Sequence, residues 1–90
     1  MIRLRLLSRP GCHLCEAMRE QVDALLAGDP HEWEILGVDE DDEAARRWSD
    51  EIPVLFVNGR LFAKGSLPAI DARSRLLRAA AEEPAGTTGA

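Results

Sequence analysis

Near the amino terminus, hydrophobic residues first alternate with polar ones and then recur at helical spacing. This change predicts a strand followed by a helix. Arginines alternate with aliphatic residues over positions 2–7, and a period of two predicts a β-strand. A turn is expected at positions 8–11, because Pro10 and Gly11 interrupt a strand and Pro10 fixes φ just ahead of a helix. Beyond the turn, apolar residues at helical spacing predict an amphipathic helix that ends near Gly28: Leu14, Met18, Val22, Leu25 and Leu26.

The middle of the chain repeats the order of strand and helix. The apolar residues Trp33, Ile35, Leu36 and Val38 predict a second short strand. Acidic residues fill positions 39–43, and such a run suits the first turn of a helix, where the macrodipole favours negative charge. We expect this helix over positions 41–49, with an inward face formed by Ala44, Ala45 and Trp48.

The last third of the chain predicts a hairpin and a final helix. Positions 52–57 are almost entirely apolar, which is typical of a buried central strand, and Asn58-Gly59 predicts a tight turn into an antiparallel strand over 60–64. Ser66 is expected to cap the last helix, whose core side is formed by Ile70, Leu76, Leu77 and Ala80. The order βαβαββα predicts one α/β domain over residues 1–83, with a flexible tail over residues 84–90.

The charge and composition of the chain argue against nucleic acid and membrane as binding partners. The 90 residues include 16 acidic and 11 basic side chains, so the formal net charge is −5. Binding of nucleic-acid phosphates needs a basic face, and a membrane-spanning helix needs about 20 apolar residues in a row. The amino terminus lacks the small-residue cleavage site of a signal peptide. We therefore expect a cytoplasmic protein with no nucleic-acid or membrane partner.

The two cysteines, Cys12 and Cys15, form a C-x-x-C motif where the first strand gives way to the first helix. Two cysteines do not build the disulfide framework of a small secreted domain, so this spacing indicates redox or metal chemistry. At the start of a helix, free N–H groups and the dipole stabilise an anion, so the thiol pKa of Cys12 should be lowered. Side chains three apart on a helix have Cβ atoms about 5–6 Å apart, whereas a disulfide needs about 3.8 Å. Cys12 is therefore expected at the cap position.

These positions predict separate roles for the two thiols. Cys12 is expected to attack a substrate disulfide, and Cys15 to attack the resulting mixed disulfide and release the product. Arg9 would add a positive charge three residues before Cys12. His13 would lower the thiol pKa further when protonated, or pass a proton; in the alternative interpretation it is an exposed residue that only tunes the potential.

With these residues in place, the sequence resembles the glutaredoxin branch of the thioredoxin-like superfamily. The likeness extends over residues 1–82 and is carried by three segments, at positions 8–15, 51–54 and 58–59. The resemblance implies a thioredoxin-like fold of glutaredoxin type, with a four-stranded mixed sheet flanked by helices.

The resemblance also assigns substrate-binding residues. It implies a cis peptide bond between Ile52 and Pro53, with the Ile52 backbone pairing with the substrate chain. Arg9 stands where the family usually has a lysine that holds a carboxylate. Gly65 is the one glycine in the segment that matches the family's glutathione-binding Gly-Gly and Asp, and His-Leu replaces the usual Pro-Tyr or Pro-Phe between the cysteines. The expected substrate-binding residues are Arg9, His13, Ile52, Pro53 and Gly65.

The resulting expectation is a thiol–disulfide oxidoreductase that reduces protein or low-molecular-weight disulfides by a dithiol mechanism. We expect a monomer with no bound cofactor, which takes electrons from glutathione or from a reductase partner. Two alternatives stay open: a non-catalytic binding module with the same fold, and a carrier of a soft metal such as copper or zinc on the C-x-x-C motif. Ferredoxin-like metal carriers have the order βαββαβ, which differs from the order here. His31 lies in another loop and is expected to be a surface residue.

Overall fold

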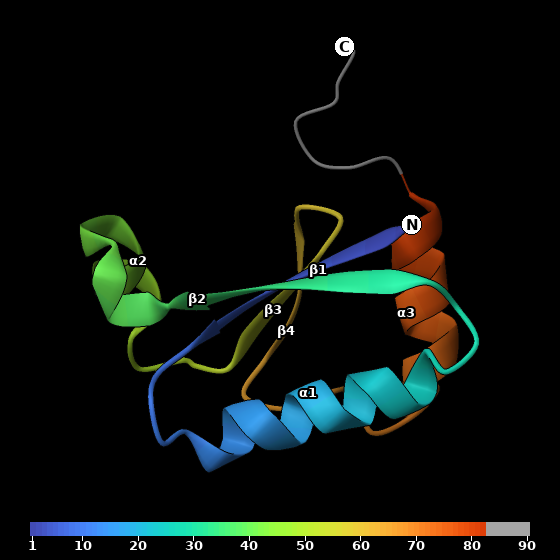
Figure 1. The fold of residues 1–90 in the computed structure, drawn as a ribbon, viewed down its shortest axis with the longest axis horizontal. Helices are drawn as coiled ribbons and strands as arrows, with labels where there is room; N and C mark the ends of the chain where they lie inside the picture. Colours follow the sequence, from blue (N-terminus) through green and yellow to red (C-terminus); the bar gives the residue numbers. More distant parts are fainter. Residues whose placement is uncertain (83–90) are drawn as a thin grey trace, which may run out of the picture.

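A computed structural model of the chain describes residues 1–82. Their elements are four strands, three α-helices and one short 3-10 helix, which follow the expected order βαβαββα (Figure 1). The bounds are β1 (Ile2–Ser8), α1 (His13–Leu25), β2 (His31–Gly37), the 3-10 helix η1 (Val38–Glu40), α2 (Asp42–Trp48), β3 (Val54–Val57), β4 (Arg60–Lys64) and α3 (Ala72–Ala81). The expected tail over residues 84–90 lies outside the described residues.

The sheet is mixed and four-stranded, as the resemblance implies. Its strand order is β2-β1-β3-β4, with β1 parallel to β2 and antiparallel to β3, and β3 antiparallel to β4. The turn between β3 and β4 has positive φ at both Asn58 (50°) and Gly59 (86°), the conformation that makes Asn-Gly a preferred hairpin turn. The side chain of Asn58 also accepts a hydrogen bond from the backbone N–H of Arg3 (3.0 Å) and donates one to the carbonyl of Ala80 (2.9 Å). The hairpin is thereby joined to both β1 and α3.

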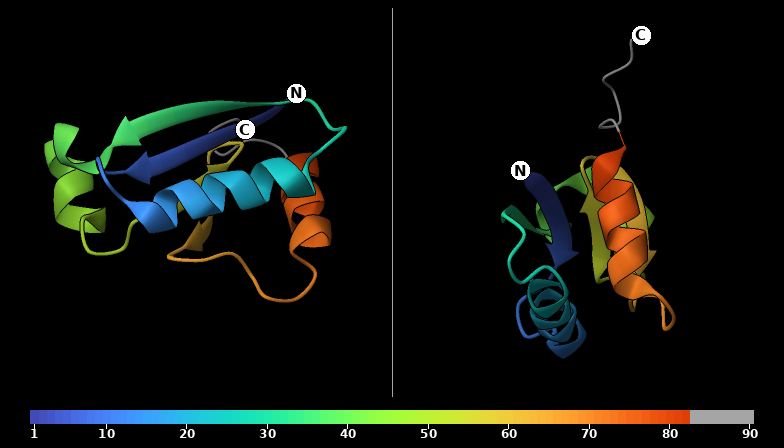
Figure 2. Two further views of the ribbon diagram at one scale, coloured as in Figure 1. Left: turned by 60° about the horizontal axis from the view of Figure 1, so that its bottom comes forward. Right: turned by 90° about the vertical axis from the view of Figure 1, so that its right-hand side faces the viewer.

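Two hydrophobic clusters lie on opposite faces of this sheet. Successive residues of a strand point to opposite faces, so Leu6 and Leu7 of β1 belong to different clusters. The main cluster fills the face covered by α1 and α3 (Figure 2), and its buried members are Leu4, Leu6, Cys15, Met18, Val22, Leu26, Leu55, Val57, Ala63 and Leu76. The smaller cluster lies under α2 and consists of Leu7, Val38 and Val54, packed by Ala44, Trp48, Ile52 and Phe56. This is the α/β sandwich that a thioredoxin-like fold requires.

The last helix begins later than the sequence indicates. It starts at Ala72 with Asp71 as its N-cap residue, so the expected cap at Ser66 is wrong, and Ile70 is 70% exposed instead of buried. The backbone N–H of Gly65 is held by the carbonyl of Pro53 (2.7 Å), whereas Arg73 bonds the carbonyl of Leu25 at the far end of α1. The chain has to cover the length of α1 before α3 can begin, so residues 65–71 form a connection (Figure 1).

Three smaller expectations also need correction. Leu14 lies on α1 but is 64% exposed, so the buried face of that helix is narrower than the apolar spacing indicates. Val38 belongs to η1 and not to the second strand, and it is fully buried. His31 is half-buried, because both of its ring nitrogens contact oxygen atoms of the loop and of α1.

Candidate active site

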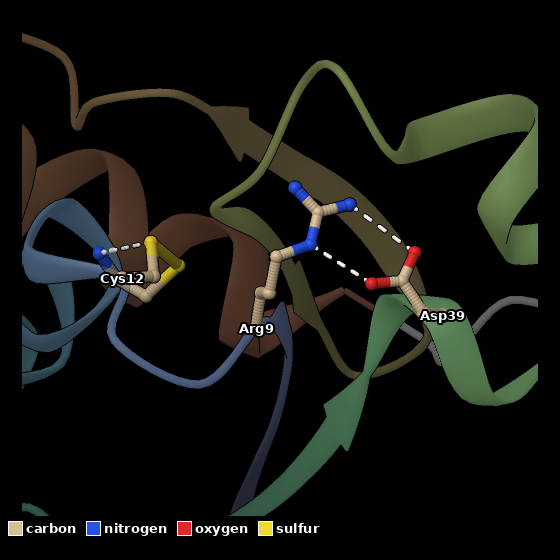
Figure 3. The surroundings of a disulfide bond; sticks show 4 residues. Arg9, Cys12 and Asp39 are labelled. Atoms are coloured by element: carbon tan, nitrogen blue, oxygen red, sulfur yellow. Dashed lines mark hydrogen bonds and ion pairs between the residues drawn. A yellow bond between two sulfur atoms is a disulfide. The ribbon is translucent and has the colours of Figure 1, made fainter.

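The two cysteines lie at the start of α1, joined by a disulfide with their Cα atoms 5.3 Å apart (Figure 3). Cys12 is the N-cap residue and has an extended backbone, while Cys15 lies within the first turn of the helix. The sulfur of Cys12 accepts a hydrogen bond from the backbone N–H of Cys15 at 3.1 Å. One of the N–H groups that a helix leaves unpaired at its amino end is therefore used by sulfur.

The two cysteines differ in exposure. Cys15 is 3% exposed and belongs to the main hydrophobic cluster, whereas Cys12 packs against that cluster from a half-buried position. Gly11, with φ of 79°, turns the chain from β1 into the helix, and a hydrogen bond from the N–H of Cys12 to the carbonyl of Arg9 (3.1 Å) closes this turn. An external disulfide therefore meets Cys12 before Cys15.

The loop before β3 contacts the end of β4 through both backbone and side-chain groups. The peptide bond between Ile52 and Pro53 is cis. The carbonyl of Pro53 accepts the N–H of Gly65, and the ammonium of Lys64 contacts the carboxylate of Glu51 at 2.8 Å. Ile52 packs against both hydrophobic clusters, so its position depends on both layers of the fold.

A model of the family described as Glutaredoxin-like domain (DUF836) matches residues 3–77. The matched segment includes both cysteines, the Ile52–Pro53 bond and Gly65, and it ends within α3. The chain belongs to the glutaredoxin-like family. Comparison of the chain with curated proteins and with solved structures gave no match.

In this glutaredoxin-like protein, Arg9 does not lie against the sulfur atoms. Its Nε and Nη2 atoms donate to the two carboxylate oxygens of Asp39, at 2.9 and 3.2 Å, and the pair points away from the disulfide (Figure 3). The hydrogen bond and the charge of Asp39 raise the pKa of Arg9, and the same hydrogen bond lowers the pKa of the Asp39 carboxyl. The guanidinium is thus engaged by a neighbouring acid.

Asp39 is a residue of the site region that the sequence analysis did not single out. It was counted only within the acidic run at 39–43. The signal that could have found it is the parallel pairing of β1 with β2, in which Ser8 lies opposite Gly37. Residues that follow the ends of two parallel neighbours emerge at the same edge of the sheet, so a cation at 9 and an acid at 39 come together.

The remaining expected site residues are placed as follows. His13 is the first residue of α1 and is exposed, next to Cys12. Gly65 has φ of 77° and lies beside Pro53 through its N–H. Within residues 1–82, no group of three or more His, Cys, Asp or Glu side chains is arranged to hold a metal ion. None of the helices in the same residues has the length and apolar character needed to cross a membrane.

Proposed function

We propose that this protein is a thiol–disulfide oxidoreductase that reduces disulfides with the Cys12–Cys15 pair. The observation that carries the proposal is the position of Cys12, a half-buried residue whose sulfur accepts the N–H of Cys15 at the start of α1. The same N–H would donate to a thiolate after reduction, and the helix dipole favours the anion there. Membership of the glutaredoxin-like family supports redox chemistry in general.

The reaction proceeds in two exchanges. The Cys12 thiolate attacks one sulfur of a substrate disulfide, the substrate S–S bond breaks, and the first substrate thiolate leaves and takes up a proton. Cys15 then loses its proton and attacks the Cys12 sulfur, the mixed disulfide breaks, and the second substrate thiol leaves. Two electrons pass to the substrate, and the protein is left with the Cys12–Cys15 disulfide.

The resting disulfide has to be reduced again by a thiol donor. Glutathione or a dithiol reductase partner supplies two electrons by the same exchange in reverse, so no bound cofactor is needed. A reducing compartment such as the cytoplasm suits this cycle. We assign substrate contact to the Ile52 backbone beside Pro53, with Gly65, His13 and Arg9 at the rim, and we assign catalysis to a single chain.

Turnover with a thiol donor tests the proposal. The pre-reduced protein is mixed with a peptide disulfide, and dithiothreitol regenerates it. Product thiols are counted by chromatography, and the thiols formed in the same mixture without protein are subtracted, because dithiothreitol also reduces the peptide directly. We expect turnover by the native chain and none by Cys12→Ser, because the attacking sulfur is lost. With dithiothreitol omitted, pre-reduced Cys15→Ser should accumulate a mixed disulfide with the peptide, visible by mass spectrometry.

The opposite results are equally clear. Turnover by Cys12→Ser at the native rate would overturn the assignment of the attacking thiol. Absence of turnover by the native chain with every disulfide offered would overturn the enzymatic function and leave a binding role for the fold.

A further inference from the structure

The Arg9–Asp39 pair has a geometry that commits the guanidinium to one carboxylate. Two N–H donors of Arg9 face the two oxygens of Asp39 (2.9 and 3.2 Å). Such fork-to-fork pairs are stronger and more directional than a single contact between charges. Both side chains keep contact with solvent, at 40% exposure for Arg9 and 59% for Asp39. The pair is therefore at the surface, and the backbone of Arg9 is hydrogen-bonded to that of Cys12 (3.1 Å).

A second carboxylate and a second ion pair add to this arrangement. Asp50 lies near enough to Arg9 that its charge, after the hydrogen bond and charge of Asp39, contributes to raising the pKa of the guanidinium. Lys64, which precedes Gly65, is paired with Glu51 at 2.8 Å. Arg9, which precedes the turn to Cys12, and Lys64 are thus both paired with acids of the same chain.

An anionic substrate meets unfavourable electrostatics at such a site. The carboxylates of a small peptide disulfide can bind the Arg9 guanidinium only if Arg9 first releases Asp39. The charge of the guanidinium is already balanced by the Asp39 carboxylate in contact with it, Asp50 adds a weaker negative charge, and the whole chain carries −5. A field of one sign lowers the encounter rate of like-charged partners and raises that of opposite charge.

We propose that Asp39 is a specificity-determining residue, which withholds Arg9 from substrate carboxylates and so favours disulfides of neutral or basic polypeptides over small anionic disulfides such as glutathione disulfide. This inference rests on the proposed function, since it concerns the substrate of the same cysteine pair. Asp39 acts through Arg9 and through its own charge, and it takes no part in the exchange of sulfur bonds.

The test measures the reaction of the pre-reduced full chain with three disulfides. They are glutathione disulfide and the disulfide dimers of two tetrapeptides, Gly-Lys-Cys-Gly and Gly-Glu-Cys-Gly, each acetylated at its amino end and amidated at its carboxyl end so that the first dimer is cationic and the second anionic. Second-order rate constants are measured by acid quench and mass spectrometry. The native chain should react fastest with the lysine peptide, and added salt should reduce this preference because the charges are exposed.

Asp39→Ala should raise the rate constants for the glutamate peptide and for glutathione disulfide by roughly 3- to 5-fold, the range of an exposed ion pair. Asp42→Ala is the matched control: it removes the same charge from the first turn of α2 and should change these rates much less. In the double variant Arg9→Gln with Asp39→Ala, most of the gain should disappear, because the released guanidinium is its main source.

Equal effects of Asp39→Ala and Asp42→Ala would overturn the inference, as would a gain that survives intact in the double variant. Native preference for glutathione disulfide over the lysine peptide would also overturn it. Failure of the proposed function has a different signature, since the native chain would then react with none of the three disulfides.

Discussion

Gly11 and Cys12 together determine how the redox pair is presented. Gly11 has φ of 79°, a conformation that L side chains rarely adopt, and it brings Cys12 to the cap of α1 with an extended backbone. Only outside the helical conformation can Cys12 approach Cys15 closely enough for a disulfide. The backbone at residue 11 is therefore part of the chemistry, although its side chain is a hydrogen atom.

Gly11→Ala should destabilise the protein by about 1–2 kcal/mol, the cost of a left-handed conformation for an L residue. A Cβ at this position meets no atom within 4 Å, so the cost comes from the backbone alone. Urea unfolding of the oxidised protein measures it. Relaxation of the strained turn should also move Cys12 off the cap and slow its reaction with a disulfide.

Gly28→Ala provides the control for this prediction. Gly28 also has positive φ (92°) and open space around a Cβ, but it lies beyond the other end of α1. The two variants should lose similar stability, and only Gly11→Ala should react more slowly. Equal reactivity of the two would show that the turn at residue 11 does not present Cys12.

At the scale of elements, α3 is attached to the rest of the molecule mainly through one side chain. Leu76 is the one residue of α3 that is buried (1% exposed), and Leu77, Ala79 and Ala80 only pack at the edge of the main cluster. The hydrogen bond from Asn58 to the carbonyl of Ala80 supports the far end of the helix. The stability of this layer should therefore depend strongly on Leu76.

Leu76→Ala should lower the free energy of unfolding by about 2–5 kcal/mol, because it removes buried methyl groups and leaves a cavity. Ile70→Ala is the matched comparison, since Ile70 is 70% exposed just before the helix and exposed substitutions change stability by about 0.5 kcal/mol or less. Urea titration of both variants checks the prediction. Similar losses for the two would mean that α3 is not anchored through Leu76.

The comparison of sequence and structure is also clearest for the elements. Strong local signals, the alternation in β1 and the Asn58-Gly59 turn among them, predicted the order of elements and the antiparallel hairpin of β3 and β4. The start of α3 was wrong because it depends on the distance between Pro53 and the end of α1, which no local pattern contains. Leu14 was expected on the buried face of α1 because its spacing is helical. The spacing does not show how wide a strip of the helix the sheet covers, and Leu14 lies outside that strip.

For the candidate site, the sequence was informative where chemistry and chain position coincide. Cys12 and Cys15 could be predicted as a cap residue and a helix residue from the turn that precedes them. The engagement of Arg9 by Asp39 could not, because it joins residues 30 apart through the register of β1 and β2. Contacts of this kind become visible only when the topology is known.

At the scale of the whole molecule, one polar cluster joins three separate parts of the fold at the end opposite the cysteines. His31, at the start of β2, contacts the carbonyl oxygen of Asp29 through Nδ1 (2.7 Å) and a carboxylate oxygen of Asp23, on α1, through Nε2 (2.8 Å). Trp33 donates to the same Asp23 oxygen (2.9 Å), and Arg73, next to the start of α3, contacts the Asp29 carboxylate (3.2 Å).

The protonation state of His31 follows from this geometry. Both partners of the ring are hydrogen-bond acceptors, and only the imidazolium form has two N–H donors. The bond to the Asp29 carbonyl, followed by that to Asp23, raises the pKa of His31 above its ordinary value of 6.5. Asp23 has a lowered pKa, first through the Trp33 N–H and then through His31, with Arg19 adding a smaller effect.

These two shifts predict a pH window for stability. A raised pKa in the folded state means that the contribution of His31 is fully present below about pH 6.5 and is lost as the pH rises through the folded-state value. The contribution of Asp23 has the opposite sense: it is present above its ordinary pKa of 3.8 and is lost as the pH falls through the lowered value. The cluster should therefore stabilise the fold most between about pH 4 and pH 6.5.

His31→Gln tests this window, and His13→Gln is the natural control because the chain has only two histidines. At pH 6 the oxidised His31→Gln variant should be less stable than the native protein by about 1 kcal/mol, the scale of the hydrogen bonds lost. The difference should shrink as the pH is raised from 6 toward 8.5, because the native ring loses a proton, and with it one N–H donor, as the pH passes through its raised pKa. His13→Gln should follow the native profile throughout, because His13 is exposed at the opposite end of α1. A constant difference for His31→Gln across this range would mean that the ring contributes through packing and not through its charge.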